Sequence, residues 1–163
     1  MPEQNTQFVE YIKENFTGDT QKNALNFVQH ITSLGMTGSG SMNDGQFVYK
    51  GVKVCNTYFG NSSHNPGYPE PWTMWGFGDY SKEVEGVQID ERMKEIAWLN
   101  LCICDDCKAS WCNRSEKREI VFDRDFENIC HGAFCFTDPN ADEVACMKSL
   151  MEMQKCAIDI KFA

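Results

Sequence analysis

Residues 102–112 have the sequence CICDDCKASWC, which places four thiols, two adjacent acids and a tryptophan within eleven positions. Four cysteine thiolates at tetrahedral positions suit Zn²⁺, and a Cys-x-x-Cys pair commonly supplies two of them from one short loop. Cys104 and Cys107 have this spacing, and Cys112 follows closely enough to bind the same ion. The spacing therefore predicts a four-cysteine zinc site. We expect it to be structural, because four protein ligands leave no open position for a catalytic water.

The fourth ligand should come from a distant segment, so that the metal cross-links two parts of the fold. We expect it to be Cys130, because the chain can turn towards a metal at the following His131-Gly132. Cys135 is an alternative, although its apolar neighbours favour an ordinary buried thiol. Cys102 would lie on the same side of a strand as the first ligand, where the site would be crowded. His131 is a nitrogen alternative.

Other chemistry is open to the same thiols. An iron–sulfur cluster could use four cysteines, but the spacing matches neither of the common ferredoxin patterns, which favours zinc. A thiol redox site is the second alternative. Asp105 and Asp106 oppose it, because acids between the thiols raise the thiolate pKa, whereas redox catalysis requires a lowered one. Of the remaining cysteines, Cys55, Cys146 and Cys156 fall in strand or helix patterns, and we expect them to be inert core thiols.

A second candidate site is the aromatic segment between His64 and Tyr80. Tyr68, Trp72, Trp75 and Tyr80 could line a pocket for a flat or apolar ligand, although burial in the core is the more common role of such rings. Strand alternation places Trp72 and Trp75 on opposite faces. The more exposed of these two tryptophans is therefore the better ligand candidate.

Hydrophobic periodicity predicts an α+β fold in which helices pack on a largely antiparallel sheet. Residues 1–163 should form one domain, with the cysteine-rich segment 102–135 within it as a metal-binding loop. The glycine-rich stretch Gly35–Gly45 should be a flexible loop, and Gly35 should end a helix. Asp90 and Asp138-Pro139 should begin helices, and Asp19 or Thr20 should cap an earlier one. The predicted helices span residues 5–16, 20–34, 91–99 and 138–158. Residues 47–59 should form two short strands or one bent strand, with Gly51 at the turn or bulge, and further strands should span residues 72–77, 119–122 and 133–136.

The charge pattern excludes a phosphate-binding face. The net charge is −9, and the four basic residues near the cysteines are balanced by four acidic ones. No apolar stretch approaches the roughly 18 residues of a membrane span. The first residues, MPEQNTQFVEYIKENF, lack the basic start and apolar run of a secretory signal. We therefore expect a cytoplasmic protein with reduced thiols, and nine cysteines could not all pair internally.

Together these patterns predict a small cytoplasmic binding domain stabilised by a structural zinc ion. Its partner should be a small molecule or a protein, with no role for nucleic acid or membrane. The alternative is a thiol-based redox or metal-responsive protein that uses the same cysteines. No constellation of nucleophile, acid and base is recognisable, so an enzymatic role is not expected.

Overall fold

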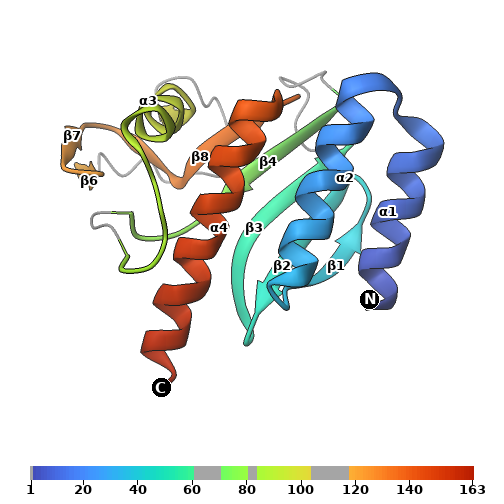
Figure 1. The fold of residues 1–163 in the computed structure, drawn as a ribbon, viewed down its shortest axis with the longest axis horizontal. Helices are drawn as coiled ribbons and strands as arrows, with labels where there is room; N and C mark the ends of the chain where they lie inside the picture. Colours follow the sequence, from blue (N-terminus) through green and yellow to red (C-terminus); the bar gives the residue numbers. More distant parts are fainter. Residues whose placement is uncertain (1, 61–70, 81–83, 104–117) are drawn as a thin grey trace.

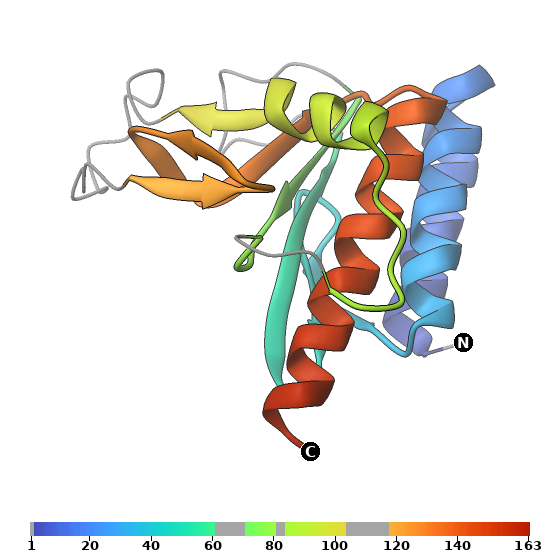
Figure 2. The same ribbon diagram turned by 60° about the vertical axis from the view of Figure 1, so that its left-hand side comes forward.

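Helices cover one face of an antiparallel sheet. The computed structural model describes residues 2–60, 71–80, 84–103 and 118–163, except for the side chains of residues 131–133. Three of the four helices lie side by side on the same face of the sheet (Figures 1 and 2); they are α1 (Glu3–Asn15), α2 (Gly18–Ser33) and α4 (Ala141–Lys161). The remaining helix, α3 (Glu91–Leu99), packs against α4, where the Cys146 thiol donates to the Met93 carbonyl at 3.4 Å.

The main sheet has six strands in the order β1-β2-β3-β4-β8-β5, and every neighbouring pair is antiparallel. In spatial order the strands are β1 (Thr37–Ser41), β2 (Asp44–Tyr49), β3 (Val52–Phe59), β4 (Trp72–Gly76), β8 (Ile129–Thr137) and β5 (Leu101–Ile103). A separate hairpin consists of β6 (Glu119–Val121) and β7 (Arg124–Phe126). The α+β class and the antiparallel sheet predicted from the sequence are confirmed.

Side-chain alternation gives the sheet two different faces. Phe47, Cys55, Gly76 and Phe134 form one cross-strand row. This row faces the helices, since its three side chains are buried and a Cβ at Gly76 would lie 3.7 Å from Met151 Cε in α4. The next row along the strands points to the opposite face and consists of Gln46, Asn56, Trp75 and Cys135.

The helix starts agree only in part with the sequence prediction. Asp90 caps α3 as expected and accepts from the Met93 N–H at 2.8 Å. The cap of α4 is not Asp138, which lies in the left-handed region at φ 41°. It is Asn140, whose side chain accepts from the N–H groups of Asp142 and Glu143, while the Glu143 carboxylate accepts from the Asn140 N–H. This reciprocal capping box satisfies more of the free N–H groups at the helix start than Asp138 could.

The cap of α2 is also different from the prediction. The helix begins at Gly18, with Thr17 as the N-cap residue and no side-chain hydrogen bond at the cap, so Asp19 and Thr20 already lie inside the first turn. Thr20 instead donates to the Asp138 carboxylate at 3.0 Å, which ties the start of α2 to the residues before α4. Tertiary contact therefore replaced the predicted local cap.

The glycine-rich stretch is not a loop. Gly35 ends α2 with φ 83°, as predicted, but the chain then forms β1 and enters β2 within the segment that was expected to be flexible. The glycines allow a close approach of α1, since a Cβ at Gly38 would lie 2.4 Å from Phe8 Cε2. Within the part of the chain that the structure describes, no helix combines the length and the hydropathy needed to cross a bilayer.

Candidate functional site

The pairing of β5 with β8 positions the start of the cysteine-rich segment. Ile103, the last residue of β5, is the antiparallel partner of Ile129, the first residue of β8. Cys104 follows Ile103 directly in the sequence, and Cys130 follows Ile129. The predicted ligands Cys104, Cys107 and Cys112 lie outside the described residues, so the zinc site that they would form stays a prediction.

The other end of the segment is fixed at the same place. Glu119 in β6 pairs with Phe126 in β7, three residues before Ile129. The hairpin is anchored to α3, because Trp98 Nε1 donates to the Val121 carbonyl at 3.0 Å and the Arg124 guanidinium lies 5.1 Å from the Trp98 ring centre. Figure 2 shows β5 and this hairpin at the same end of the molecule. Residues 103 and 119 lie on either side of the part of this segment that carries Cys104, Cys107 and Cys112. Both are thus held beside the stretch that leads into Cys130.

A charged pair closes the base of this hairpin. Arg118 Nε lies 2.8 Å from both carboxylate oxygens of Asp125, so the guanidinium and carboxylate meet edge to edge. The hydrogen bond from Arg118 and its positive charge lower the pKa of Asp125 and keep this carboxyl ionised. This contact adds a second restraint where the chain leaves the cysteine-rich segment.

Three of the described cysteines lie on the paired strands β5 and β8. Cys130 is partly exposed, Cys102 is buried, and Cys135 is partly exposed with its Sγ 4.0 Å from Thr137 Oγ1. The side chain of the alternative ligand His131 is outside the described part. Among the described residues, no three His, Cys, Asp or Glu side chains form a group that could hold a metal. The three cysteines therefore do not make a site by themselves, and any metal here would need ligands whose side chains lie outside the described part, such as those of Cys104, Cys107, Cys112 or His131.

Two of the other described thiols are buried in the core. Cys55 and Cys146 are buried, and burial raises the pKa of each thiol to about 12. This agrees with the inert role expected from the sequence, since the thiolate is the reactive form. Cys156 differs, because it is partly exposed while Met153 and Ile158 on the same helix face the core.

The aromatic candidates separate into core residues and one surface residue. Trp72 is buried, with its ring centre 5.9 Å from those of Phe59 and Phe27, and Tyr80 is buried against Phe134 at 4.8 Å. Trp75 lies on the opposite face and is partly exposed. The predicted opposition of Trp72 and Trp75 is confirmed. Tyr68 lies outside the described residues, so Trp75 is the described member best placed to contact a ligand.

The neighbours of Trp75 were not predicted from the sequence. Trp75 lies between Asn56 of β3 and Cys135 of β8, and the next row on the same face contains Tyr58, Thr73 and Thr137. Asn56 Nδ2 donates to the Tyr58 hydroxyl oxygen at 3.4 Å. Burial raises the pKa of Tyr58 and keeps its phenol neutral, although this hydrogen bond has the opposite effect. Alternation in residues 54–59 could have identified Asn56 and Tyr58, but their position beside Trp75 required the strand register.

A separate hollow of about 340 Å³ lies between α3 and the start of α4. Its apolar wall is Ile96 and Leu99. Three of its four charged groups are already paired, since Arg92 binds Asp142 at 2.5 Å and the Glu143 carboxylate is used in the capping box of α4; the fourth is Glu95. Among the residues that the structure describes, no cysteine or histidine lines this hollow.

Comparisons of the chain with protein-family models, with curated proteins and with solved structures found no match. The functional interpretation is therefore based on the chain's own residues and their geometry.

Proposed function

We propose that this protein is a small cytoplasmic binding domain in which a structural zinc ion fixes the cysteine-rich segment through Cys104, Cys107, Cys112 and Cys130. One observation carries this proposal: strand pairing holds residues 103 and 119 beside residues 126–129, immediately before Cys130. A loop of this kind begins and ends beside its fourth ligand. A metal bound there would close the loop onto β8.

The strand contacts favour Cys130 over the alternatives. Cys130 adjoins Ile129, which pairs with the residue before Cys104, and its side chain is partly exposed. Cys135 lies five residues further along β8, opposite Trp75. Cys102 is buried and precedes Ile103 in the chain, whereas Cys104 and the other two predicted ligands of this loop follow Ile103. With zinc–sulfur bonds of about 2.3 Å, the ligand closest to both ends of the segment needs the least chain movement.

The proposed ligand surface is the sheet face that carries Trp75. Its ring, with the Tyr58 phenol and the Asn56 amide beside it, offers an apolar plane and two hydrogen-bonding groups. This surface and the proposed ligand Cys130 share strand β8, because Cys135 in the Trp75 row lies five residues after Cys130 on that strand. A structural zinc would thus hold the segment that adjoins the binding face, and the partner would be a small molecule or a protein.

Serine substitutions test the proposed ligand set. Cys130→Ser should lose the zinc that the wild type retains during dialysis against a chelator, and its melting temperature should fall by several degrees, because a structural zinc contributes directly to folding stability. Cys156→Ser is the matched control and should keep both properties. Cys135→Ser separates the two candidate ligands of β8. Full zinc retention and an unchanged melting temperature in Cys130→Ser would refute the assignment of this residue.

The same measurements distinguish the alternative chemistries. Iron with a broad visible absorption band would indicate an iron–sulfur cluster. A protein without metal, whose thiols oxidise and are reduced reversibly, would support the redox or metal-responsive alternative. Zinc bound at one ion per chain, with no change under mild oxidants, supports the structural role.

A further inference from the structure

The outer edge of β1 is hydrogen-bonded by side chains of a helix. Strand β1 ends the sheet, and among the described residues no other strand pairs with its outer side. The Gly38 N–H donates to Asn5 Oδ1 at 2.6 Å, Asn5 Nδ2 donates to the Met36 carbonyl at 3.0 Å, and Gln4 Nε2 donates to the Gly40 carbonyl at 3.1 Å. Residues 36, 38 and 40 alternate along the chain, so their backbone groups face the same edge.

The Asn5 side chain uses its amide oxygen and both amide hydrogens in hydrogen bonds. It is completely buried, and its second amide hydrogen points to Thr32 Oγ1 at 2.7 Å. The three hydrogen-bond partners of Asn5 lie in different segments: Thr32 near the end of α2, Met36 just before β1, and Gly38 in β1. A buried amide with its acceptor and both donor hydrogens satisfied is a costly group to replace, because any apolar side chain would leave backbone groups unpaired.

The sequence of β1 offers no protection of its own. Thr37–Ser41 is TGSGS, without a charged residue or a proline. Natural edge strands usually carry one of these features, since a bare edge is a template for pairing with another chain. Its two glycines carry no side chain that could shield the backbone.

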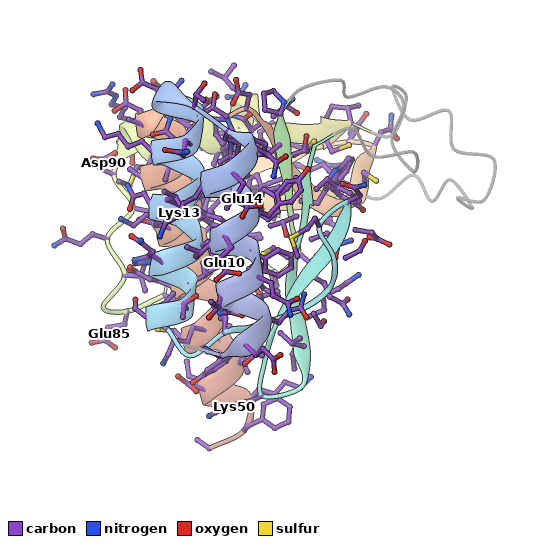
Figure 3. All side chains as sticks on the ribbon, turned by 90° about the vertical axis from the view of Figure 1, so that its right-hand side faces the viewer. Glu10, Lys13, Glu14, Lys50, Glu85 and Asp90 are labelled. Carbon is purple, nitrogen blue, oxygen red and sulfur yellow. The ribbon has the colours of Figure 1, made fainter. Side chains whose placement is uncertain are left out.

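Helix α1 fits closely over this edge because side chains are absent beneath it. A Cβ at Gly38 would lie 2.4 Å from Phe8 Cε2, and a Cβ at Gly45 would lie 2.9 Å from Phe8 Cζ. Figure 3 shows α1 on the outside of the molecule, with Glu10, Lys13 and Glu14 on its solvent side. The helix therefore has a charged outer surface and an inner surface that contacts the strand.

We propose that Gln4 and Asn5 substitute for a seventh strand and so prevent β1 from pairing with β1 of a second copy of this chain. The partner is a second copy because the exposed edge would be identical in both molecules, and two such edges pair antiparallel about a twofold axis. The proposal is independent of the zinc site.

Two separate substitutions open the edge. Asn5→Ala removes the amide, and Gly38→Ala pushes Phe8 and Asn5 away while leaving α1 unchanged in sequence. Sedimentation velocity should show that the wild type is a monomer and that both variants self-associate. The dimer dissociation constant of each variant should be lower than that of the wild type by about tenfold or more. Adding Thr37→Lys to either variant should restore the monomer, because Thr37 is exposed and like charges across paired edges repel.

Circular dichroism identifies variants that fail to fold, and Gln4→Ala, which removes only an exposed hydrogen bond, supplies a milder third variant. Folded variants that stay monomeric at the highest concentration would overturn the proposal. A wild-type dimer that Thr37→Lys dissociates would also overturn it, since the edge would then already be open.

Discussion

Ile103 of β5 and Ile129 of β8 are antiparallel partners, and each directly precedes a cysteine of the proposed zinc site. Their pairing brings together two positions that are 26 residues apart in the chain. Ile129 belongs to the hydrophobic core, so the packing of the domain and the placement of the proposed fourth ligand depend on the same side chain.

Removing the Ile129 side chain should therefore affect stability and metal binding together. Ile129 is 2% exposed, and Ile129→Ala should lower the free energy of unfolding by about 2–4 kcal/mol through lost burial and an unfilled cavity. Ile120→Ala is the matched control, because Ile120 is 53% exposed and its truncation should cost no more than about 0.5 kcal/mol. Urea unfolding of both variants checks the difference, and equal costs would contradict the buried position of Ile129.

The close approach of Gly78 to the buried Gln154 side chain gives a second stability prediction. A Cβ at Gly78 would lie 1.8 Å from Gln154 Nε2, and the Gln154 amide has little space to move because it is buried beside Tyr80. Gly78→Ala should cost about 1–3 kcal/mol. Gly76→Ala should cost less, since its nearest neighbour would be at 3.6 Å. Thermal unfolding of the Gly78→Ala/Gln154→Ala double variant should show partial recovery; strictly additive costs would argue against the clash.

Thiol reactivity should follow burial. Burial raises the pKa of Cys55 and Cys146 to about 12, so neither should be alkylated by iodoacetamide in the folded protein. Partly exposed Cys156 should be labelled under the same conditions. Peptide mass spectrometry after short labelling checks the order. Rapid labelling of Cys55 in the folded state would show that the core opens far more readily than its packing indicates.

His30 should make stability depend on pH. Its Nε2 lies 3.0 Å from Glu152 Oε1. Burial lowers the pKa of His30, Lys148 acts in the same direction, and Glu152 opposes them. The folded protein therefore resists protonation, while the unfolded chain binds a proton below about pH 6.5. The free energy of unfolding should fall as the pH decreases from above this value towards the lowered pKa.

The control for this prediction is His30→Gln, which cannot titrate. Urea midpoints measured from about pH 7.5 to about pH 5.5 should decline more steeply for the wild type than for the variant. A wild type that gains stability over the variant at the lower pH would show that the Glu152 contact outweighs burial.

Local patterns predicted the helices better than the strands. The apolar spacing of α1 and α2 and the Asp90 cap of α3 were sufficient, because a helix is stabilised by residues near in sequence. Strand β1 could not be predicted, since its glycines serve the approach of Phe8 from α1. Their role is visible only after folding.

Strand β6 was predicted from the sequence, but β7 and the hairpin that joins it to β6 were missed for a related reason. Its turn places Phe122 at φ 47° and Asp123 at φ 61°, a conformation normally used by Asn and Gly. Phe122 tolerates it because its ring is buried against Tyr80 and its N–H donates to the Tyr80 carbonyl at 3.0 Å. Tertiary packing here outweighs the intrinsic preference of the turn.

For the candidate site, spacing alone predicts Cys104, Cys107 and Cys112 as ligands, because Cys-x-x-Cys is a local pattern, and these residues lie outside the described part of the chain. The choice among more distant cysteines depended on the β5–β8 register, which no local pattern contains. The β3–β4 register likewise placed Tyr58 and Asn56 beside Trp75. Long-range pairing, and not residue type, was the missing information.

The most direct test of the zinc proposal is elemental analysis of the wild-type protein purified anaerobically without added metal, together with its visible absorption spectrum. A structural four-cysteine site predicts one zinc ion per chain and no visible band. Protein that contains no metal, or iron with a broad visible band, would contradict it.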